Sequence, residues 1–214
     1  YGGTGKCLVC SISPMTDIPI DSNVGGYFGP FLKFSGFDVI ELTGKAEEDV
    51  IIVIDGNKGT VSIEKAPLEH KDAHVLGEEL TTMYAEDDND RKNVAVVCSG
   101  SAADHCNLSM LNFTFYDPKR NVVRLKQAGR GGIGRVFADK HIKALVCHFK
   151  GVKANLNHVY DISILNRDGL KFHREVATQD DKQNSMRKSG TAYSLRIMSD
   201  YDILPTRNYK YCLL

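Results

Sequence analysis

The stretch Val50–Glu64, VIIVIDGNKGTVSIE, determines how the first half of the chain is interpreted. Two β-prone runs, Val50–Asp55 and Thr60–Glu64, flank the short segment Asp55–Gly59. Glycine and asparagine tolerate the positive φ angles that a tight connection between two strands requires. The sequence therefore predicts a β-hairpin here.

Further predicted strands lie on both sides of this hairpin in the sequence. One segment, Ala73–Ala85, instead carries apolar residues at helical spacing, and the pattern becomes helical again from His158 onward. We therefore predict an α+β chain, with a β-rich domain in residues 1–152 and the beginning of a helical domain in residues 153–214. The further predicted strands are Lys6–Ser13, Asp38–Thr43, Asn93–Cys98, Asn112–Tyr116, Val122–Leu125 and Ala144–Phe149.

Composition narrows the class of protein. The 214 residues include 27 basic and 27 acidic side chains, a balance that argues against a nucleic-acid partner held by net charge. Residues 1–100 carry a net charge of −9 and residues 101–214 a net charge of +9, which makes a local anion site in the second half plausible. No apolar run is long enough to span a membrane. Six cysteines, mostly in or beside apolar runs, favour a reducing cytoplasm.

The segment Asp21–Pro30, DSNVGGYFGP, is the first of two glycine-rich segments. Three glycines in five residues remove the Cβ atoms that would keep a flat or anionic ligand away from the backbone. Ser22 and Asn23 add a hydroxyl and a carboxamide, and the carboxamide oxygen is a suitable ligand for a divalent cation. A tight turn before an apolar segment is the alternative interpretation.

The second glycine-rich segment is Lys126–Arg135, KQAGRGGIGR. Consecutive glycines let neighbouring N–H groups converge on an anion, and the flanking basic side chains suit phosphate. The letters fit GxGxxG, but a dinucleotide site also needs an acidic residue about 20 positions further on. Lys150 stands there, so a dinucleotide site is weakly supported.

Three separated motifs together resemble one enzyme family. The segments Ser13–Val50, Leu125–Val146 and Gly190–Tyr211 are similar, in this order, to the amino-terminal part of the aldehyde:ferredoxin oxidoreductases. These are tungsten enzymes that use two pterins. The resemblance implies two β-sheets that form a base for a tungsten bis-pyranopterin, and it implies that the chain is part of something longer.

The resemblance also implies which residues meet the cofactor. One pterin and its phosphate would lie at Ser22, Asn23, Val24, Gly25 and Gly26, and the other at Gln127, Ala128, Gly129, Arg130 and Gly131. Asn23 and Ala128 would offer oxygens to a magnesium ion that bridges the pterin phosphates. Gln127 is the alternative to Ala128, since the family more often has Arg-Ala-Ala-Gly at this point. Arg207 and Asn208, in the LPTRN motif, would lie near the cofactor or in a loop capped by its threonine.

The implied function is oxidation of aldehydes to carboxylic acids, with electrons passed to ferredoxin or an electron-transfer subunit. The iron–sulfur (4Fe–4S) cluster and the catalytic residues of the family lie further downstream, so no catalytic residue is assigned here. The segment Phe113–Leu125 also resembles the tungsten subunit of benzoyl-coenzyme A reductase, whose substrate is an aromatic acyl-CoA. A cofactor-free binding or structural module is the other alternative. The sequence is also compatible with an oligomer.

Overall fold

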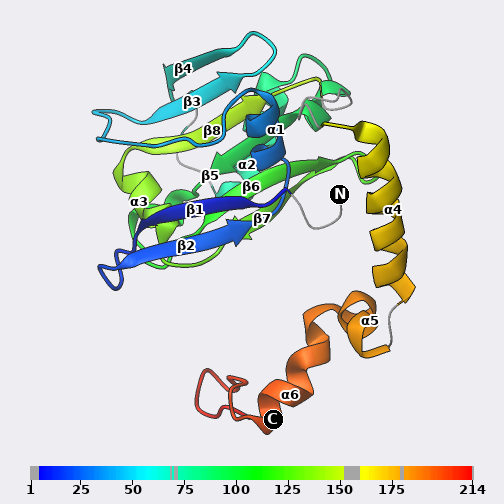
Figure 1. The fold of residues 1–214 in the computed structure, drawn as a ribbon. Coiled ribbons are helices and arrows are strands. Elements are labelled where there is room, and N and C mark those ends of the chain that lie inside the picture. The colour runs from blue at the N-terminus through cyan, green and yellow to red at the C-terminus, as the bar shows by residue number, and fades with distance from the viewer. Residues whose placement is uncertain (1–4, 68, 70–71, 152–159, 179–180, 214) are drawn as a thin grey trace. The chain divides into compact units, whose positions relative to one another are not determined.

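The computed structural model describes residues 5–67, 69, 72–151, 160–178 and 181–213. The chain divides into two compact units, one within residues 3–158 and one that holds residues 159–214, and each is considered by itself (Figure 1). The domain boundary predicted between residues 152 and 153 lies outside the described residues.

The first unit is built on a six-stranded sheet with the strand order β4-β3-β8-β5-β6-β7. Only the pair β3 and β8 is parallel, and the other neighbours are antiparallel. The predicted hairpin is confirmed, because Asp55 pairs with Thr60 and Gly59 has a φ of +69° in the connection. The strands are β3 (Val50–Asp55), β4 (Thr60–Lys65), β5 (Val94–Cys98), β6 (Leu111–Asp117), β7 (Val122–Ala128) and β8 (Ile142–His148).

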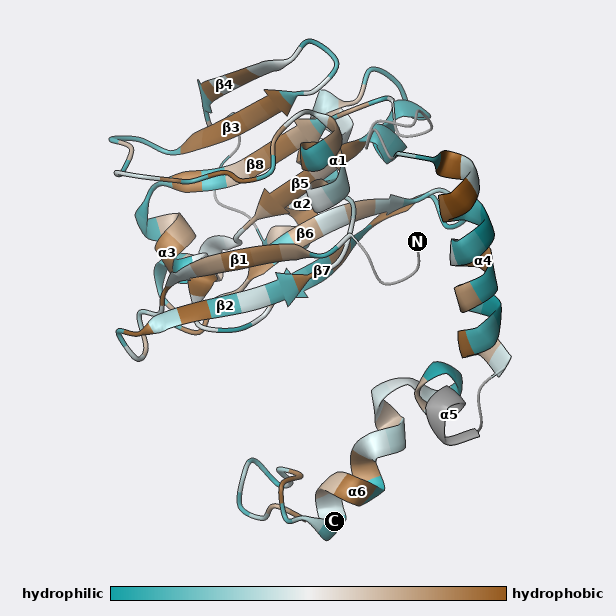
Figure 2. Cartoon of the chain, in the orientation of Figure 1, coloured by the Kyte–Doolittle hydropathy of each residue, from teal (hydrophilic) through white to brown (hydrophobic). Residues whose placement is uncertain are grey.

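Helix α2 (Ala73–Tyr84) covers one face of this sheet and confirms the helix predicted there. Asp72 caps its N-terminus, because the Asp72 carboxylate accepts hydrogen bonds from the backbone N–H groups of His74 and Val75 at 2.8 and 3.1 Å. Leu80 is fully buried against the central strands. Every residue of β5 and β8 is buried. Figure 2 shows β5 as hydrophobic, whereas β8 is hydrophobic in its middle and carries the polar residues Lys143 and His148 near its ends.

A second, smaller sheet covers the other face of the six-stranded sheet, together with helices α1 (Phe28–Phe34) and α3 (Ile133–Asp139). It pairs β1 (Cys7–Ile12) with β2 (Pro19–Val24) in antiparallel register. The main core of the unit lies between these layers. Strand β2 and helix α1 replace the loop or turn interpreted from the sequence. The prediction of an α+β chain with two sheets in its β-rich part is confirmed.

The strand predicted at Asp38–Thr43 was wrong. This segment has no strand assignment, although its side chains do alternate between half-buried and exposed. Ile40 and Leu42 pack against the main core, while Val39 is 78% exposed. The alternation that suggested a strand therefore reflects packing of an extended segment against the core, without pairing to a neighbouring strand.

The second unit is helical, as predicted. It contains α4 (Ile162–Thr178), α5 (Asp181–Ser189), a 3-10 turn at Gly190–Ser194 and α6 (Leu195–Asp200). Figure 2 shows polar and apolar residues alternating along α4. Across the described residues, no helix combines the length and the apolar character that crossing a lipid bilayer demands.

Candidate functional site: a hollow between the ends of two strands

Strand β2 carries the first glycine-rich segment up to Val24. Its side chains alternate, with Ser22 and Val24 buried and Asp21 and Asn23 exposed. Pairing with β1 places Asp21 opposite Cys10 and Asn23 opposite Leu8. Since successive side chains of a strand point to opposite faces, Asp21 and Asn23 project together from the outer face of the small sheet.

Strand β7 carries the start of the second glycine-rich segment. It is an edge strand of the large sheet and ends at Ala128, which is fully buried opposite Leu111. The chain then turns into α3 through Gly131 and Gly132, whose φ angles are +72° and +67°. These positive angles explain the two glycines by backbone conformation alone.

The two segments meet in space. The backbone N–H of Arg130 donates a hydrogen bond of 3.3 Å to the hydroxyl oxygen of Ser22, across 108 positions of sequence. Gly131 lies against Ile20, so closely that a Cβ atom there would overlap the isoleucine side chain. A hollow of about 460 Å³ opens beside this contact, and it is lined by Asp21, Ser22, Asn23, Gln127, Gly129 and Arg130.

Two glycines near the hollow are not required by the fold. Neither Gly25 nor Gly129 has a positive φ, and a Cβ atom built on either would meet no heavy atom within 4 Å. In contrast, a Cβ atom on Gly132 or Gly134 would overlap a backbone carbonyl oxygen. Backbone conformation and internal packing therefore leave Gly25 and Gly129 unexplained, whereas close approach of a ligand to the main chain would explain both.

The lining contains one acidic and one basic side chain. Within the described part of the chain, neither the Asp21 carboxylate nor the Arg130 guanidinium forms a hydrogen bond or ion pair with another residue. Asp21 was missed by the sequence analysis, which began its site at Ser22. The signal was available, because a strand through this segment would place Asp21 on the same face as Asn23.

The predicted site residues thus separate into groups. Five of them line the hollow: Ser22, Asn23, Gln127, Gly129 and Arg130. Val24 and Ala128 lie next to these but have buried side chains, so only their backbone groups are available to a ligand. Gly26 has a φ of +99° and approaches the Thr114 carbonyl. Gly25 is open, and Gly131 packs on Ile20.

Arg207 and Asn208 belong to the second unit, which is described by itself. Both have left-handed backbone conformations, with φ of 48° and 57°. The Arg207 guanidinium lies 5.9 Å from the centre of the Tyr211 ring, and Thr206 forms a β-bridge with Tyr211. The LPTRN segment therefore forms a tight turn within the second unit.

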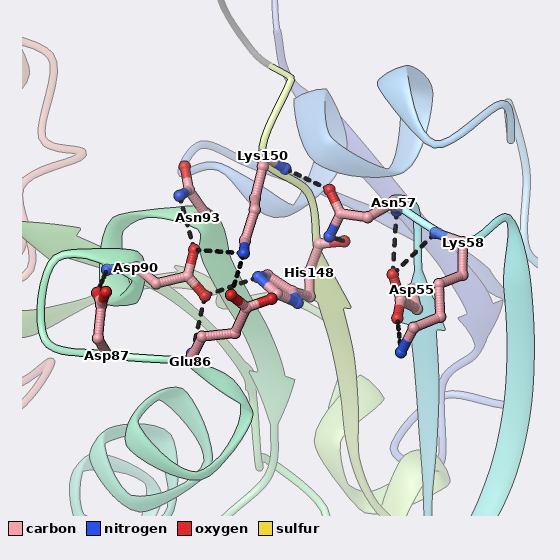
Figure 3. Close-up of polar contacts among 9 residues, drawn as sticks. All are labelled: Asp55, Asn57, Lys58, Glu86, Asp87, Asp90, Asn93, His148 and Lys150. Carbon is pink, nitrogen blue, oxygen red and sulfur yellow. Dashed lines mark hydrogen bonds and ion pairs between the residues drawn. The ribbon is translucent and has the colours of Figure 1, made fainter.

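A buried contact between a histidine and an aspartate lies elsewhere in the first unit (Figure 3). His148 Nε2 is 2.8 Å from a carboxylate oxygen of Asp90, and both side chains are less than 10% exposed. No hydrogen bond of suitable geometry joins this nitrogen to another described residue, so the contact is defined by distance alone. Lys150 adds a 2.5 Å contact to Glu86.

This cluster joins three segments of the chain. The backbone N–H of Lys150 donates to the side-chain oxygen of Asn57, and the carbonyl of His148 accepts from the N–H of Gly56. The loop that follows α2, the end of β8 and the β3–β4 connection are held together in this way. The role of this cluster is therefore structural, because it fixes these three segments to one another.

The cysteines give no metal centre in the described residues. Cys7 is half-buried against the core and Cys10 is exposed, as opposite faces of a strand require. No group of three histidine, cysteine, aspartate or glutamate side chains suited to a metal ion is found among the described residues.

Comparison with known proteins places the chain in a family. Residues 1–149 match the family model described as aldehyde ferredoxin oxidoreductase, N-terminal domain. The chain is 30% identical over 207 residues to the tungsten-containing aldehyde ferredoxin oxidoreductase of Pyrococcus horikoshii, and 29% identical over 221 residues to that of Pyrococcus furiosus. Each match covers 96% of this chain and 31% of the relative, so the chain spans about a third of these relatives.

A solved structure is also similar. The active site complex BamBC of benzoyl coenzyme A reductase, in complex with 1,5-dienoyl-CoA, matches with a TM-score of 0.54 and 26% sequence identity. The match covers 68% of this chain and 20% of that chain. From the family model and these relatives together, the chain belongs to the aldehyde ferredoxin oxidoreductase family, with residues 1–149 as its N-terminal domain.

Proposed function

We propose that this chain is the cofactor-binding part of a tungsten bis-pyranopterin oxidoreductase. The observation that carries the proposal is the hollow between the ends of β2 and β7. Two segments that are far apart in sequence meet there. They present a guanidinium that has no partner among the described residues, two carboxamides and an unshielded glycine. Such a surface suits a phosphorylated ligand that approaches the main chain closely.

The side chains present fit the phosphate end of this cofactor. Arg130, which pairs with no other described residue, supplies a cation for phosphate oxygens, and Gly129 leaves its backbone accessible. Asn23 would offer a carboxamide oxygen to a magnesium ion, and Ala128 or Gln127 would offer a main-chain carbonyl. When bound, the tungsten cofactor supplies the redox chemistry, while the protein positions it and tunes it by hydrogen bonding.

The proposed reaction is oxidation of an aldehyde to a carboxylic acid, with ferredoxin or an electron-transfer subunit as acceptor, in a cytoplasmic enzyme. The names of the relatives support tungsten and this reaction. A 4Fe–4S cluster would be held by residues outside this chain. Arg207 and Asn208 are proposed to approach the cofactor from the second unit.

Elemental analysis tests the proposal. Protein that contains these residues, purified anaerobically from its native host, should contain tungsten or molybdenum and release a fluorescent pterin. Absence of both would favour the cofactor-free binding module and exclude the proposed function.

Two substitutions test the hollow itself. Arg130→Ala and Asn23→Ala should lower pterin and metal content without unfolding the first unit, because both side chains line the hollow outside the core. Arg120→Ala is the matched control, since this arginine lies in the β6–β7 connection and pairs with Asp117. Full cofactor content in the Arg130 variant would remove Arg130 from the site.

A second candidate is the tungsten subunit of a benzoyl-coenzyme A reductase-type enzyme. The solved complex whose title names this activity shares 26% identity with the chain. In addition, residues 113–125 form most of the β6–β7 hairpin, whose strand β7 continues to Gln127 in the lining of the hollow. Assaying the cofactor-loaded enzyme with an aldehyde and with an aromatic acyl-CoA distinguishes the two candidates.

A further inference from the structure

The hollow contains a carboxylate that phosphate binding alone does not explain. Asp21 and Arg130 are the charged residues of its lining, and neither is paired with another described residue. Their charges cancel. A phosphate monoester that carries about −1.5 to −2 charges at neutral pH would therefore enter a hollow with no net compensation.

Asp21 and Asn23 are positioned so that both can bind the same cation. They project from the same face of β2, two residues and about 6.6 Å apart along the strand, and both carry hard oxygen atoms. Magnesium in proteins is typically held by one or two carboxylates together with phosphate oxygens, and it retains several waters. A divalent cation would also balance the charge that the phosphate brings.

We propose that Asp21 couples phosphate binding in this hollow to a divalent cation, by binding the ion directly or through one of its waters. The inference rests on the proposed function, because it assumes that a phosphate group occupies the hollow. It assigns to Asp21 a role that the charge of the site requires: without the cation, the carboxylate repels the phosphate, and with the cation it attracts the pair.

The test uses the 214-residue chain, inorganic phosphate and Mg²⁺. Phosphate affinity is measured by titration with and without Mg²⁺, and the amide NMR signals of Gly129 and Arg130 report binding at the hollow. In the parent chain we expect Mg²⁺ to raise phosphate affinity by roughly 5–150-fold, the range typical of coupled binding. In Asp21→Asn the ratio should fall several-fold below the parental ratio, although Asn23 and the main-chain carbonyl remain as ligands. Phosphate should also bind more tightly than in the parent chain when Mg²⁺ is absent, because the repulsion is gone.

Asp17→Asn is the matched control. Asp17 lies in the β1–β2 connection, is exposed and does not line the hollow, and asparagine tolerates its φ of 56°. This variant should keep the Mg²⁺ dependence of phosphate binding that the parent chain has. That result would show that loss of a surface charge alone does not remove the Mg²⁺ dependence.

The outcomes separate this inference from the proposed function. Phosphate binding by the parent chain that is independent of Mg²⁺ would overturn the role of Asp21 and leave the anion site standing. Full Mg²⁺ coupling in Asp21→Asn would also overturn it. Failure of phosphate to shift the Gly129 and Arg130 signals under either condition would overturn both proposals.

Discussion

At the scale of single residues, glycines near the hollow differ in what requires them. Gly129→Ala should leave stability unchanged or raise it by about 0.4–1 kcal/mol, because the backbone conformation suits alanine and the space is open. Gly132→Ala should destabilise the first unit by about 1–3 kcal/mol from backbone strain, with overlap on the Asn107 carbonyl in addition. Denaturant unfolding measures both. Cofactor content of the folded Gly129 variant should fall, and a stable variant with full content would exclude close ligand approach there.

The buried Asp90–His148 pair makes a second prediction at this scale. Burial raises the pKa of Asp90, but hydrogen bonds from the Glu86 N–H and Asn93, and the charges of His148 and Lys150, outweigh it, so that the net pKa is lowered. A carboxyl with a lowered folded pKa contributes stability above its unfolded pKa of about 3.9 and loses it as pH falls through the folded value.

Stability should therefore decline below about pH 4 in the parent chain. Asp90→Asn cannot ionise, so its unfolding free energy should be lower at neutral pH and flatter across the acid range. Thermal or denaturant unfolding between neutral and acid pH checks this. Asp88→Asn, an exposed neighbour in the same loop, should retain the parental profile. An equal slope in the Asp90 variant would contradict the prediction.

At the scale of elements, the sequence predicted the segments whose hydrophobic pattern and turns agree. The β3–β4 hairpin, strands β5 and β8, and helix α2 have apolar runs or helical spacing bounded by turn residues. Strand β2 was missed, because its exposed Asp21 and Asn23 and buried Ser22 make it polar where strands are usually apolar. The segments of the site were predicted by resemblance, but the part played by Asp21 depends on strand pairing, which single residues do not reveal.

Helix α1 was missed for a related reason. It has only seven residues and follows two glycines, so its helical spacing was too short to recognise. Tertiary packing stabilises this helix. Phe28 is 3% exposed, and its ring packs edge-on against the Phe113 ring with 5.9 Å between the ring centres. Phe28→Ala should cost about 3–5 kcal/mol in unfolding free energy, measured with denaturant. Val39→Ala, at an exposed position, should change it little, and a small loss for Phe28 would show that α1 is not an anchor.

Helix α2 depends on the residue that caps its N-terminus. The Asp72 side chain accepts two backbone N–H groups that would otherwise lack partners. Asp72→Ala should lower stability by about 0.5–2 kcal/mol, whereas Asp72→Asn, which keeps an acceptor, should lose much less. Chemical denaturation of the two variants compares them directly. Equal losses would show that the charge, rather than the hydrogen bonds, stabilises the helix start.

At the scale of the whole molecule, the described residues form a hollow that suits a phosphorylated ligand, but they bring together no set of ligands for an iron–sulfur cluster. A 4Fe–4S cluster needs four cysteine ligands. The described cysteines form no such group. In addition, burial raises the pKa of Cys98 to about 12 and that of Cys147 to about 11, which keeps these two thiols protonated. The relatives it matches are about three times longer.

We therefore expect the 214-residue chain by itself to bind phosphate at its hollow yet to catalyse no aldehyde-dependent reduction of an artificial electron acceptor. Ligand binding depends on β2 and β7, which lie within one unit, whereas turnover also needs a path that carries electrons away from the cofactor. Anaerobic assay of the chain after incubation with cofactor extract, with iron analysis of the same sample, tests this. Stoichiometric iron together with turnover would contradict the prediction, because it would show that the electron path lies within these residues. The cysteine ligands of the cluster would then have to move from their positions in the fold.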